Sequence, residues 1–239
     1  MRVVSCVPSL SELAEELSPG CLAGRTRFCN SPSGLKSIPS IGGTKDLDTG
    51  RIIRLKPDLV LSVKEENTRE QILELREAGL KVEVFDIRNL VEAIAMVEKC
   101  GFLLSSPEKA AGISARMKEL LRPAGEKGSI LYFIWKKPWM LAGRDTFIGD
   151  LLEKSGFRNL APEGARYPEL AGTDEIIQLH PDIIFLSSEP YPFREKDLAF
   201  FQNILPETRV MFVDGSIFSW YGSRTAMLPE FLRGLGFSD

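Results

Sequence analysis

The sequence predicts an α/β protein made of two Rossmann-like lobes with parallel sheets, joined by a single long helix. Three observations carry this prediction: an internal repeat, an alternation of buried strands with helices, and one helix that stands between the repeated halves. We expect an N-terminal lobe over residues 1–104, the connecting helix over 105–126 and a C-terminal lobe over 127–239.

The repeat is clearest in one helix–turn–strand unit. Arg51–Leu61 reads RIIRLKPDLVL, and Glu175–Phe185 reads EIIQLHPDIIF, at a constant offset of 124 positions. In both copies a Pro-Asp turn ends a short helix and precedes a buried strand. Two more pairs keep the same order: Arg2–Val7 with Ser129–Trp135, and Lys81–Asp86 with Arg209–Asp214. Three matches in one order indicate two similar lobes.

The connecting helix is predicted over Ser105–Arg122. Ser106 is suited to cap it, and Pro107 is suited to its first position. Apolar residues recur at helical spacing, which predicts one buried stripe: Ala110, Ile113, Met117 and Leu120. Pro123 and Gly125 then end the helix.

The first lobe is expected to alternate strand and helix from its start. The expected strands cover residues 3–7, 22–26, 59–63 and 81–86. The first expected helix follows the first strand and ends near residue 17, and the other three cover about 48–56, 68–78 and 91–100. Ser9 or Ser11 is expected to cap the first helix. The pair Gly42-Gly43 indicates backbone that turns sharply or lies close to another group.

The second lobe repeats the alternation. Its expected strands cover residues 130–135, 183–186 and 209–213, and its expected helices cover about 148–154, a segment from about 174, and the end of the chain after 224. Asp145 or Thr146 is expected to cap the helix at 148.

Composition excludes several classes of protein. The net charge is −3 with both signs mixed, so no nucleic-acid partner is expected. No apolar run reaches the roughly 18 residues of a membrane-spanning helix, so no membrane insertion is expected. The start carries no export leader, which predicts a cytoplasmic protein, or a periplasmic or lipid-anchored one if a leader has been removed. The four cysteines match no zinc or redox spacing and are expected to be buried thiols, with a Cys21–Cys29 disulfide relevant only to an exported form.

Candidate ligand-binding residues come from the loops that follow the predicted strands, because ligands of parallel α/β sheets bind at the carboxyl ends of strands. The candidates are Arg27, Phe28, Lys64, Glu65, Glu66, Trp135, Trp139, Tyr167, Glu189, Tyr191, Phe193, Trp220, Tyr221 and Arg224. All three tryptophans are among them, and aromatic rings at loop tips favour a broad amphipathic ligand in the cleft between the lobes. The alternative for each ring is that it fills space between the lobes.

Catalysis and metal binding are not predicted. His180 is the only histidine and falls at a helix end away from the cleft, so neither a His-based metal site nor a Ser-His-Asp triad can form. Glu65 and Glu66 would point apart on an extended segment. An enzyme acting on a small anionic metabolite through Glu65 and Glu189 is kept as an alternative.

The two-lobe layout with one connecting helix resembles the substrate-binding proteins of ABC importers for cobalamin, haem and ferric siderophores. The strongest local matches are Val3–Glu12, Ile41–Lys45 and Leu55–Val60. The chain looks most like the cobalamin-binding branch, and within it like a subgroup without an evident signal peptide. The motifs of that subgroup are Lys64–Asn67, Trp135–Trp139, Glu189–Phe193 and Trp220–Gly222.

This resemblance implies a helical-backbone, class III binding protein that captures a corrinoid such as cobalamin without catalysis and without a cofactor. An iron–siderophore or haem is the alternative ligand. The resemblance further implies a monomer and an ABC permease partner, docked through acidic residues at the start of each Pro-Asp helix. Here those residues are Asp48 in the first lobe and Asp174 and Glu175 in the second, and Gly50 stands where a glutamate is common in the family.

Overall fold

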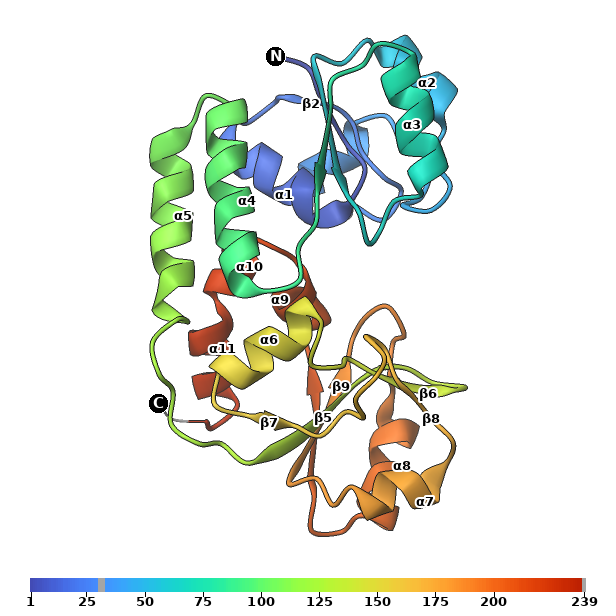
Figure 1. The fold of residues 1–239 in the computed structure, drawn as a ribbon, viewed down its shortest axis with the longest axis vertical. Coiled ribbons are helices and arrows are strands. Elements are labelled where there is room, and N and C mark those ends of the chain that lie inside the picture. Colours follow the sequence, from blue (N-terminus) through green and yellow to red (C-terminus); the bar gives the residue numbers. More distant parts are fainter. Residues whose placement is uncertain (30–32, 238–239) are drawn as a thin grey trace. The chain divides into compact units, whose positions relative to one another are not determined.

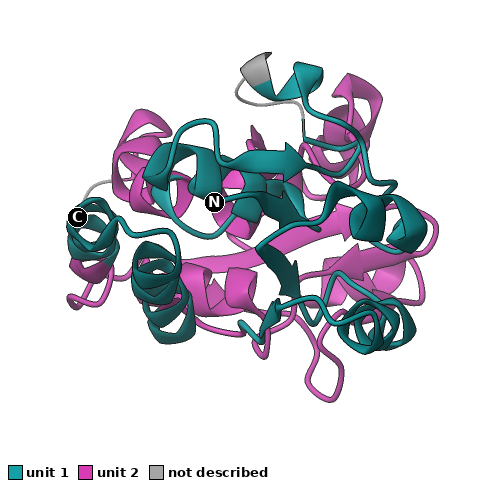
Figure 2. Cartoon of the chain, turned by 90° about the horizontal axis from the view of Figure 1, so that it is seen from above, with its two compact units in different colours: residues 1–87, 91–117, 220–223 teal, residues 88–90, 118–219, 224–239 magenta. Residues whose placement is uncertain are grey.

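The computed structural model describes residues 1–29 and 33–237, which form two compact units (Figure 2). Unit 1 consists of Met1–Ile87, Val91–Met117 and Trp220–Ser223. Unit 2 consists of Arg88–Leu90, Lys118–Ser219 and the chain from Arg224. The chain therefore passes between the units more than once, and the linear domain boundaries expected from the sequence stay a prediction.

Unit 1 is built on a four-stranded parallel sheet in the order β2-β1-β3-β4. The strands are β1 (Val3–Ser5), β2 (Leu22–Gly24), β3 (Leu59–Val63) and β4 (Val82–Phe85). Strand β3 is buried at all five positions, as expected for a central parallel strand with both faces covered.

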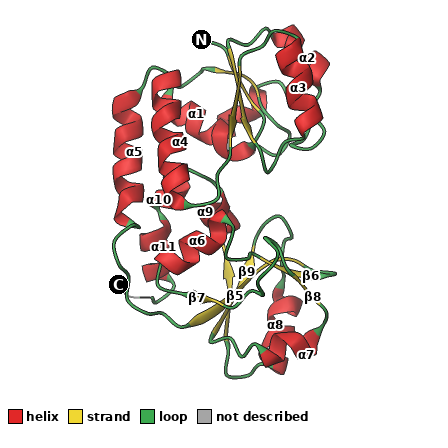
Figure 3. Ribbon diagram, viewed as in Figure 1, coloured by secondary structure: helices red, strands yellow, loops and turns green. Residues whose placement is uncertain are grey.

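Helices cover both faces of this sheet (Figures 1 and 3). They are α1 (Pro8–Leu17), α2 (Thr49–Leu55), α3 (Arg69–Glu77), α4 (Leu90–Leu103) and α5 (Pro107–Glu119), with a 3₁₀ turn at Ser33–Ser37. Helices α2 and α3 lie on one face, and α1, α4 and α5 lie on the other.

The predicted serine cap of α1 is wrong. The helix begins at Pro8, its N-cap is Val7, and no side chain caps it. The Ser11 hydroxyl instead donates back to the Val7 carbonyl at 3.0 Å. Proline at the first helical position explains the earlier start, because it has no N–H to satisfy and its φ suits a helix.

The predicted connecting helix is present as α5 but is shorter than expected. Its buried face contains Ala110, Ile113 and Met117, as the spacing predicts, and Leu120 is buried just beyond it. The Ser106 hydroxyl donates to the Leu104 carbonyl at 3.4 Å, and Ser106 supplies its own carbonyl to the Ala110 N–H.

Unit 2 extends the same parallel arrangement with antiparallel strands. Its sheet has the order β10-β9-β5-β6-β8, and β7 pairs with β5. Strands β10, β9, β5 and β7 are parallel, whereas β6 runs antiparallel to both β5 and β8. The strands are β5 (Ser129–Trp135), β6 (Trp139–Leu141), β7 (Arg158–Asn159), β8 (Glu169–Leu170), β9 (Ile183–Ser187) and β10 (Arg209–Val213).

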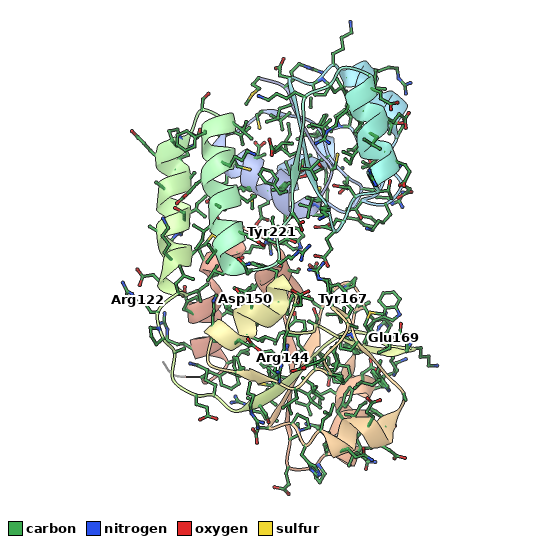
Figure 4. All side chains as sticks on the ribbon, in the orientation of Figure 1. Arg122, Arg144, Asp150, Tyr167, Glu169 and Tyr221 are labelled. Atoms are coloured by element: carbon green, nitrogen blue, oxygen red, sulfur yellow. The ribbon has the colours of Figure 1, made fainter. Side chains whose placement is uncertain are left out.

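The helices of unit 2 are again found on both faces. They are α6 (Phe147–Lys154), α7 (Thr173–Gln178), α8 (Glu195–Ile204), α9 (Gly215–Ser219), α10 (Ser223–Ala226) and α11 (Leu228–Gly234). Thr146 caps α6, accepting the Gly149 N–H at 3.0 Å, as predicted. Asp150 of α6, labelled in Figure 4, accepts the N–H of Leu90, a residue of the same unit, at 2.7 Å.

The internal repeat is visible in the geometry of the two Pro-Asp turns. Lys56 and His180, 124 positions apart, both adopt a left-handed backbone, with φ of 48° and 44°. In unit 1 the carboxylate of Asp58 accepts the Arg2 N–H at 2.7 Å, and in unit 2 that of Asp182 accepts the Ser129 N–H at 2.7 Å. Each aspartate thereby fixes the start of the first strand of its own unit.

The four cysteines are buried free thiols, as expected. Burial raises the pKa of Cys6 and of Cys100 to about 12, so both thiols are protonated and unreactive at neutral pH. None of the helices in the described ranges combines the length and the apolar character that crossing a bilayer requires.

Candidate functional site

The candidate residues lie in loops that follow the strands of each unit, and the two units are described separately. In unit 1 the carboxyl ends of β1, β3 and β4 lie at one edge of the sheet because these strands are parallel. We call the loops at this edge the unit 1 strand-end surface: residues 25–29, 41–48, 64–67 and 86–87.

Arg27 and Phe28 form the first part of this surface. The Arg27 guanidinium donates two bonds to the Asp46 carboxylate, at 2.9 and 3.1 Å, and its central carbon lies 5.1 Å from the Phe28 ring centroid. The ring itself is 50% exposed. Gly43 permits the ion pair, because a Cβ there would clash with both charged side chains. The close approach that the Gly-Gly pair predicts is therefore confirmed.

Lys64, Glu65 and Glu66 form a turn rather than an extended segment, since Val63 accepts the Glu66 N–H at 3.2 Å. Lys64 pairs with Asp86 at 2.5 Å, and both side chains are exposed to solvent. The Glu65 carbonyl accepts the Lys45 ammonium at 2.6 Å. The turn is thus tied to the loops on either side of it.

Asn67 is the side chain that organises this surface, and the sequence reasoning did not select it. Its Oδ1 accepts the Val63 N–H at 3.0 Å, and its Nδ2 donates to the carbonyls of Cys6 at 3.1 Å and Thr44 at 2.9 Å. It is buried. A buried amide that joins the ends of β1 and β3 to the loop after Gly43 fixes the relative positions of all three segments.

The last two unit 1 candidates come from far along the chain. Trp220 is partly buried and Tyr221 is buried (Tyr221 is labelled in Figure 4). They belong to the segment Trp220–Ser223, where Gly222 has a φ of 104° and Ser223 donates to Glu16 of α1. This segment therefore packs on α1, and the burial of Tyr221 matches the alternative that a ring fills space.

Unit 2 gathers its aromatic candidates into one row. Trp135, 40% exposed, meets Tyr191 edge to face at 5.6 Å between ring centroids. Tyr191 meets Phe193 at 4.9 Å, and Phe193 lies parallel to Trp139 at 6.4 Å. Trp139 also stacks on Phe200 at 5.6 Å. We call these five rings the unit 2 aromatic row. It runs from an exposed end at Trp135 to the partly buried rings of Trp139 and Phe200, which pack on the core of the unit.

One ion pair lies under the row. Lys136 donates to the carboxylate of Asp197, which is fully buried, and its ammonium lies 5.2 Å from the Trp139 ring centroid. Asp197 also accepts the Arg194 N–H at 2.9 Å, at the start of α8. Burial alone would raise the pKa of Asp197, but the hydrogen bonds from Lys136 and Arg194 outweigh it and hold this pKa below its ordinary value.

The polar candidates of unit 2 are Glu189, which follows β9, and Arg224, which lies in α10. Glu189 accepts the Ser219 hydroxyl at 2.8 Å. Arg224 donates to the Ser216 hydroxyl at 2.6 Å, and Ser216 donates to Asp214 at 2.6 Å. Both Glu189 and Arg224 are thus engaged by serines of α9.

Tyr167 lies in the loop before β8, near Glu169 (both labelled in Figure 4), and Arg166 lies 5.8 Å from its ring centroid. The predicted docking residues all stand at helix starts. Asp48 caps α2 by accepting the Arg51 N–H at 2.8 Å. Asp174 and Glu175 fall in the first turn of α7, where Glu175 accepts the Ala171 N–H at 2.7 Å. Their role in docking stays a prediction, as does ligand contact by each candidate above.

Among the described residues, no group of three or more His, Cys, Asp or Glu side chains is placed to hold a metal ion. His180 follows α7 and precedes β9, at the end of the strand opposite to the candidate residues. Burial raises the pKa of Tyr132, whose hydroxyl donates to Ser187 at 3.2 Å, so this phenol stays protonated.

Known proteins with detectable sequence similarity include vitamin B12-binding proteins. That of Salmonella typhi is 23% identical over 198 residues, covering 79% of this chain and 73% of its own length. That of Vibrio cholerae serotype O1 (strain M66-2) is 22% identical over 194 residues, covering 78% and 70%.

Solved structures share the fold over the whole chain. The periplasmic haem-binding protein HutB of Vibrio cholerae superposes with a TM-score of 0.82 at 18% identity, covering 100% of this chain and 99% of its own. The periplasmic vitamin B12-binding protein BtuF of Vibrio cholerae superposes with a TM-score of 0.81 at 17% identity, covering 99% and 98%. The predicted class III binding-protein fold is thereby confirmed. Residues 3–206 match the family described as periplasmic binding protein. Because that match spans most of the sequence, this chain belongs to the periplasmic binding protein family.

Proposed function

We propose that this protein binds a corrinoid, with cobalamin as the type ligand, and releases it chemically unchanged. The observation that carries the proposal is the unit 2 aromatic row, which presents Trp135 and Tyr191 at its exposed end. Large conjugated ligands are held by aromatic edges and faces, which offer broad apolar contact with little loss of side-chain entropy. Similarity to vitamin B12-binding proteins supports the same ligand class.

Non-catalytic binding is favoured by the way the charged candidates are used. The carboxylate of Glu189 accepts the Ser219 hydroxyl at 2.8 Å. A general acid–base pair needs titrating groups aimed at a substrate, often with shifted pKa values. The Glu189→Gln variant separates the two hypotheses. An enzyme would show a pH-dependent turnover that this substitution abolishes, whereas a binding protein would show no turnover in either form.

Haem is the second candidate ligand, since the haem-binding protein HutB shares the fold as closely as BtuF does. A haem site needs an axial ligand. The exposed histidine, His180, lies at the wrong end of β9, and Tyr132 is buried and protonated, so Tyr167 or Tyr191 would have to ligate iron. The corrinoid proposal needs no such ligand, because a cobalamin reaches the protein with its cobalt already coordinated.

Calorimetric titration of the purified protein with cyanocobalamin, cobinamide and haemin tests the proposal. We expect saturable heat at one ligand per chain for both corrinoids and quenching of tryptophan fluorescence on binding. Haem binding with a charge-transfer band that Tyr191→Phe or Tyr167→Phe abolishes would replace corrinoid by haem. No heat from either corrinoid at high micromolar concentration would overturn the proposal.

A further inference from the structure

The Lys136–Asp197 ion pair links two loops of unit 2. The first, residues 136–138 between the strand-end residues Trp135 and Trp139, joins β5 to β6, and the second, residues 188–194, joins β9 to α8. Lys136 belongs to the first loop and donates to Asp197 of α8. Asp197 in turn accepts the N–H of Arg194, the last residue of the second loop. A single buried carboxylate therefore binds both loops.

The same two loops carry the exposed end of the aromatic row. Trp135 immediately precedes Lys136, and Tyr191 lies three residues before Arg194. The two rings touch edge to face, and this contact is worth little by itself at a partly solvated site. Trp135 is the last residue of β5, and its pairing with Met140 of β6 already fixes its backbone. The ion pair adds the link from this hairpin to the second loop, and without that link ordering Tyr191 against Trp135 on binding would cost affinity.

We propose that Lys136 is a positioning residue that holds Trp135 against Tyr191, so that the two rings form a preformed edge for the face of a planar, conjugated ligand. This inference rests on the proposed function for its ligand and on Lys136, Asp197 and Arg194 for its mechanism. Lys136 suits the task because its ammonium is anchored twice, by the carboxylate and by the face of Trp139. Its side chain is 21% exposed, so most of it is taken up by these two contacts.

The sequence contains a matched control. Lys137 is the next residue, has the same charge, lies in the same loop and is exposed. Lys137→Met therefore repeats the change of charge and of residue type at a position outside the ion pair. Because Lys136→Met would leave a buried carboxylate unpaired, the test variant is the double substitution Lys136→Met with Asp197→Asn, which removes both charges together.

The ligand-free protein is examined first, by fluorine NMR of chains labelled with fluorinated tryptophan. Three signals are expected, one for each tryptophan, assigned by single substitutions. The double variant should shift and broaden the signals of Trp135 and Trp139 and leave the signal of Trp220 unchanged. The two control variants, Lys136→Arg and Lys137→Met, should both give the wild-type spectrum. A wild-type Trp135 signal in the folded double variant would overturn the proposal even if no ligand binds.

Ligand binding is then measured in a double-mutant cycle with cobinamide. We expect the double variant to weaken binding about tenfold in the wild-type background and less than twofold in the Trp135→Ala background, because the ion pair acts through that ring. Equal loss in both backgrounds would show a merely structural role and contradict the proposal. If wild-type protein binds no corrinoid, the proposed function fails, and the NMR experiment alone decides the role of Lys136.

Discussion

The two units share a frame but differ in how they hold the loops at the ends of their strands. In both, three central strands run parallel, a Pro-Asp turn precedes the middle one, and an aspartate fixes the first. At the strand ends of unit 1, the uncharged buried amide of Asn67 joins three backbone segments. At those of unit 2, a buried ion pair and stacked rings serve the same purpose.

This difference indicates that the strand ends of the two units expose different kinds of surface. A side-chain amide fixes backbone without presenting apolar surface, so unit 1 offers exposed charges such as the pairs Arg27–Asp46 and Lys64–Asp86. The aromatic row of unit 2 packs against the Lys136–Asp197 ion pair through Trp139, and it exposes apolar surface at Trp135. The repeat therefore explains the common scaffold, and the residues that depart from the repeat form the surface for which we propose ligand binding.

The largest expected effect is on the ion pair of unit 2. Lys136→Met should lower the free energy of unfolding by about 3–5 kcal/mol, because it leaves the carboxylate of Asp197 buried without its partner. Asp197→Asn should cost less, since Lys136 can reach solvent. Urea unfolding followed by circular dichroism measures both, and equal costs would show that the burial of Asp197 is not what makes the pair sensitive.

The same carboxylate predicts a pH dependence. The pKa of Asp197 is lowered in the folded protein, so its contribution to stability is present above the unfolded pKa of about 3.9 and is lost as pH falls through the lower folded value. Unfolding curves of the wild type should therefore lose this contribution below about pH 4. In Asp197→Asn that part of the acid sensitivity should be missing, and an unchanged acid profile would refute the prediction.

Unit 1 should respond strongly to loss of its amide. Asn67→Ala leaves the Val63 N–H and the carbonyls of Cys6 and Thr44 without their partner, which should cost about 2–4 kcal/mol of unfolding free energy. Thr68→Ala, at the adjacent partly buried position, is the control and should cost under about 1 kcal/mol. Equal costs would show that Asn67 does not organise the surface.

The sequence reasoning reached the scaffold more fully than the site. Strands such as β5 and β9 were predictable because buried parallel strands form continuous apolar runs and because each has a counterpart in the other half of the repeat. Strands β7 and β8, two residues each, were missed because so short a strand carries no periodicity.

The support of the site was harder to predict than its exposed residues. Trp135 and Tyr191 were selected because aromatic residues after strands are visible in the sequence. Asp197 was not, because its role depends on a side chain 61 positions away. Asn67 was not selected either, although it closes the motif Lys64–Asn67. The signal that could have found it is an uncharged amide next to three charged residues at a strand end, which is suited to bind backbone.

The Pro-Asp turns should differ by a smaller amount. Asp182 accepts both the N–H and the hydroxyl of Ser129, which lower its pKa, whereas Asp58 accepts the single N–H of Arg2. Asp182→Ala should therefore destabilise the protein by about 1 kcal/mol and Asp58→Ala by less. Thermal unfolding of the two variants side by side measures the difference, and the reverse order would contradict the geometric comparison.

The smallest expected effect has the opposite sign. Lys56 and His180 adopt a left-handed backbone that costs a residue with a side chain about 1 kcal/mol relative to glycine. Lys56→Gly and His180→Gly should each stabilise the protein by roughly 0.5–1 kcal/mol. Ala111→Gly, at an exposed position inside α5, is the control and should destabilise it. Destabilisation at both repeat positions would show that these side chains contribute more than their backbone costs.

The difference in exposed surface between the units is tested most directly by comparing two aromatic truncations. Phe28 of unit 1 and Trp135 of unit 2 are similarly exposed rings at strand ends, at 50% and 40%. We expect Trp135→Ala to weaken cobinamide binding by about 1–3 kcal/mol in calorimetric titration, and Phe28→Ala to weaken it by less than about 0.5 kcal/mol, with both variants folded as the wild type is. A larger loss from Phe28→Ala than from Trp135→Ala would contradict the account, because it would place the apolar contact with the ligand in unit 1.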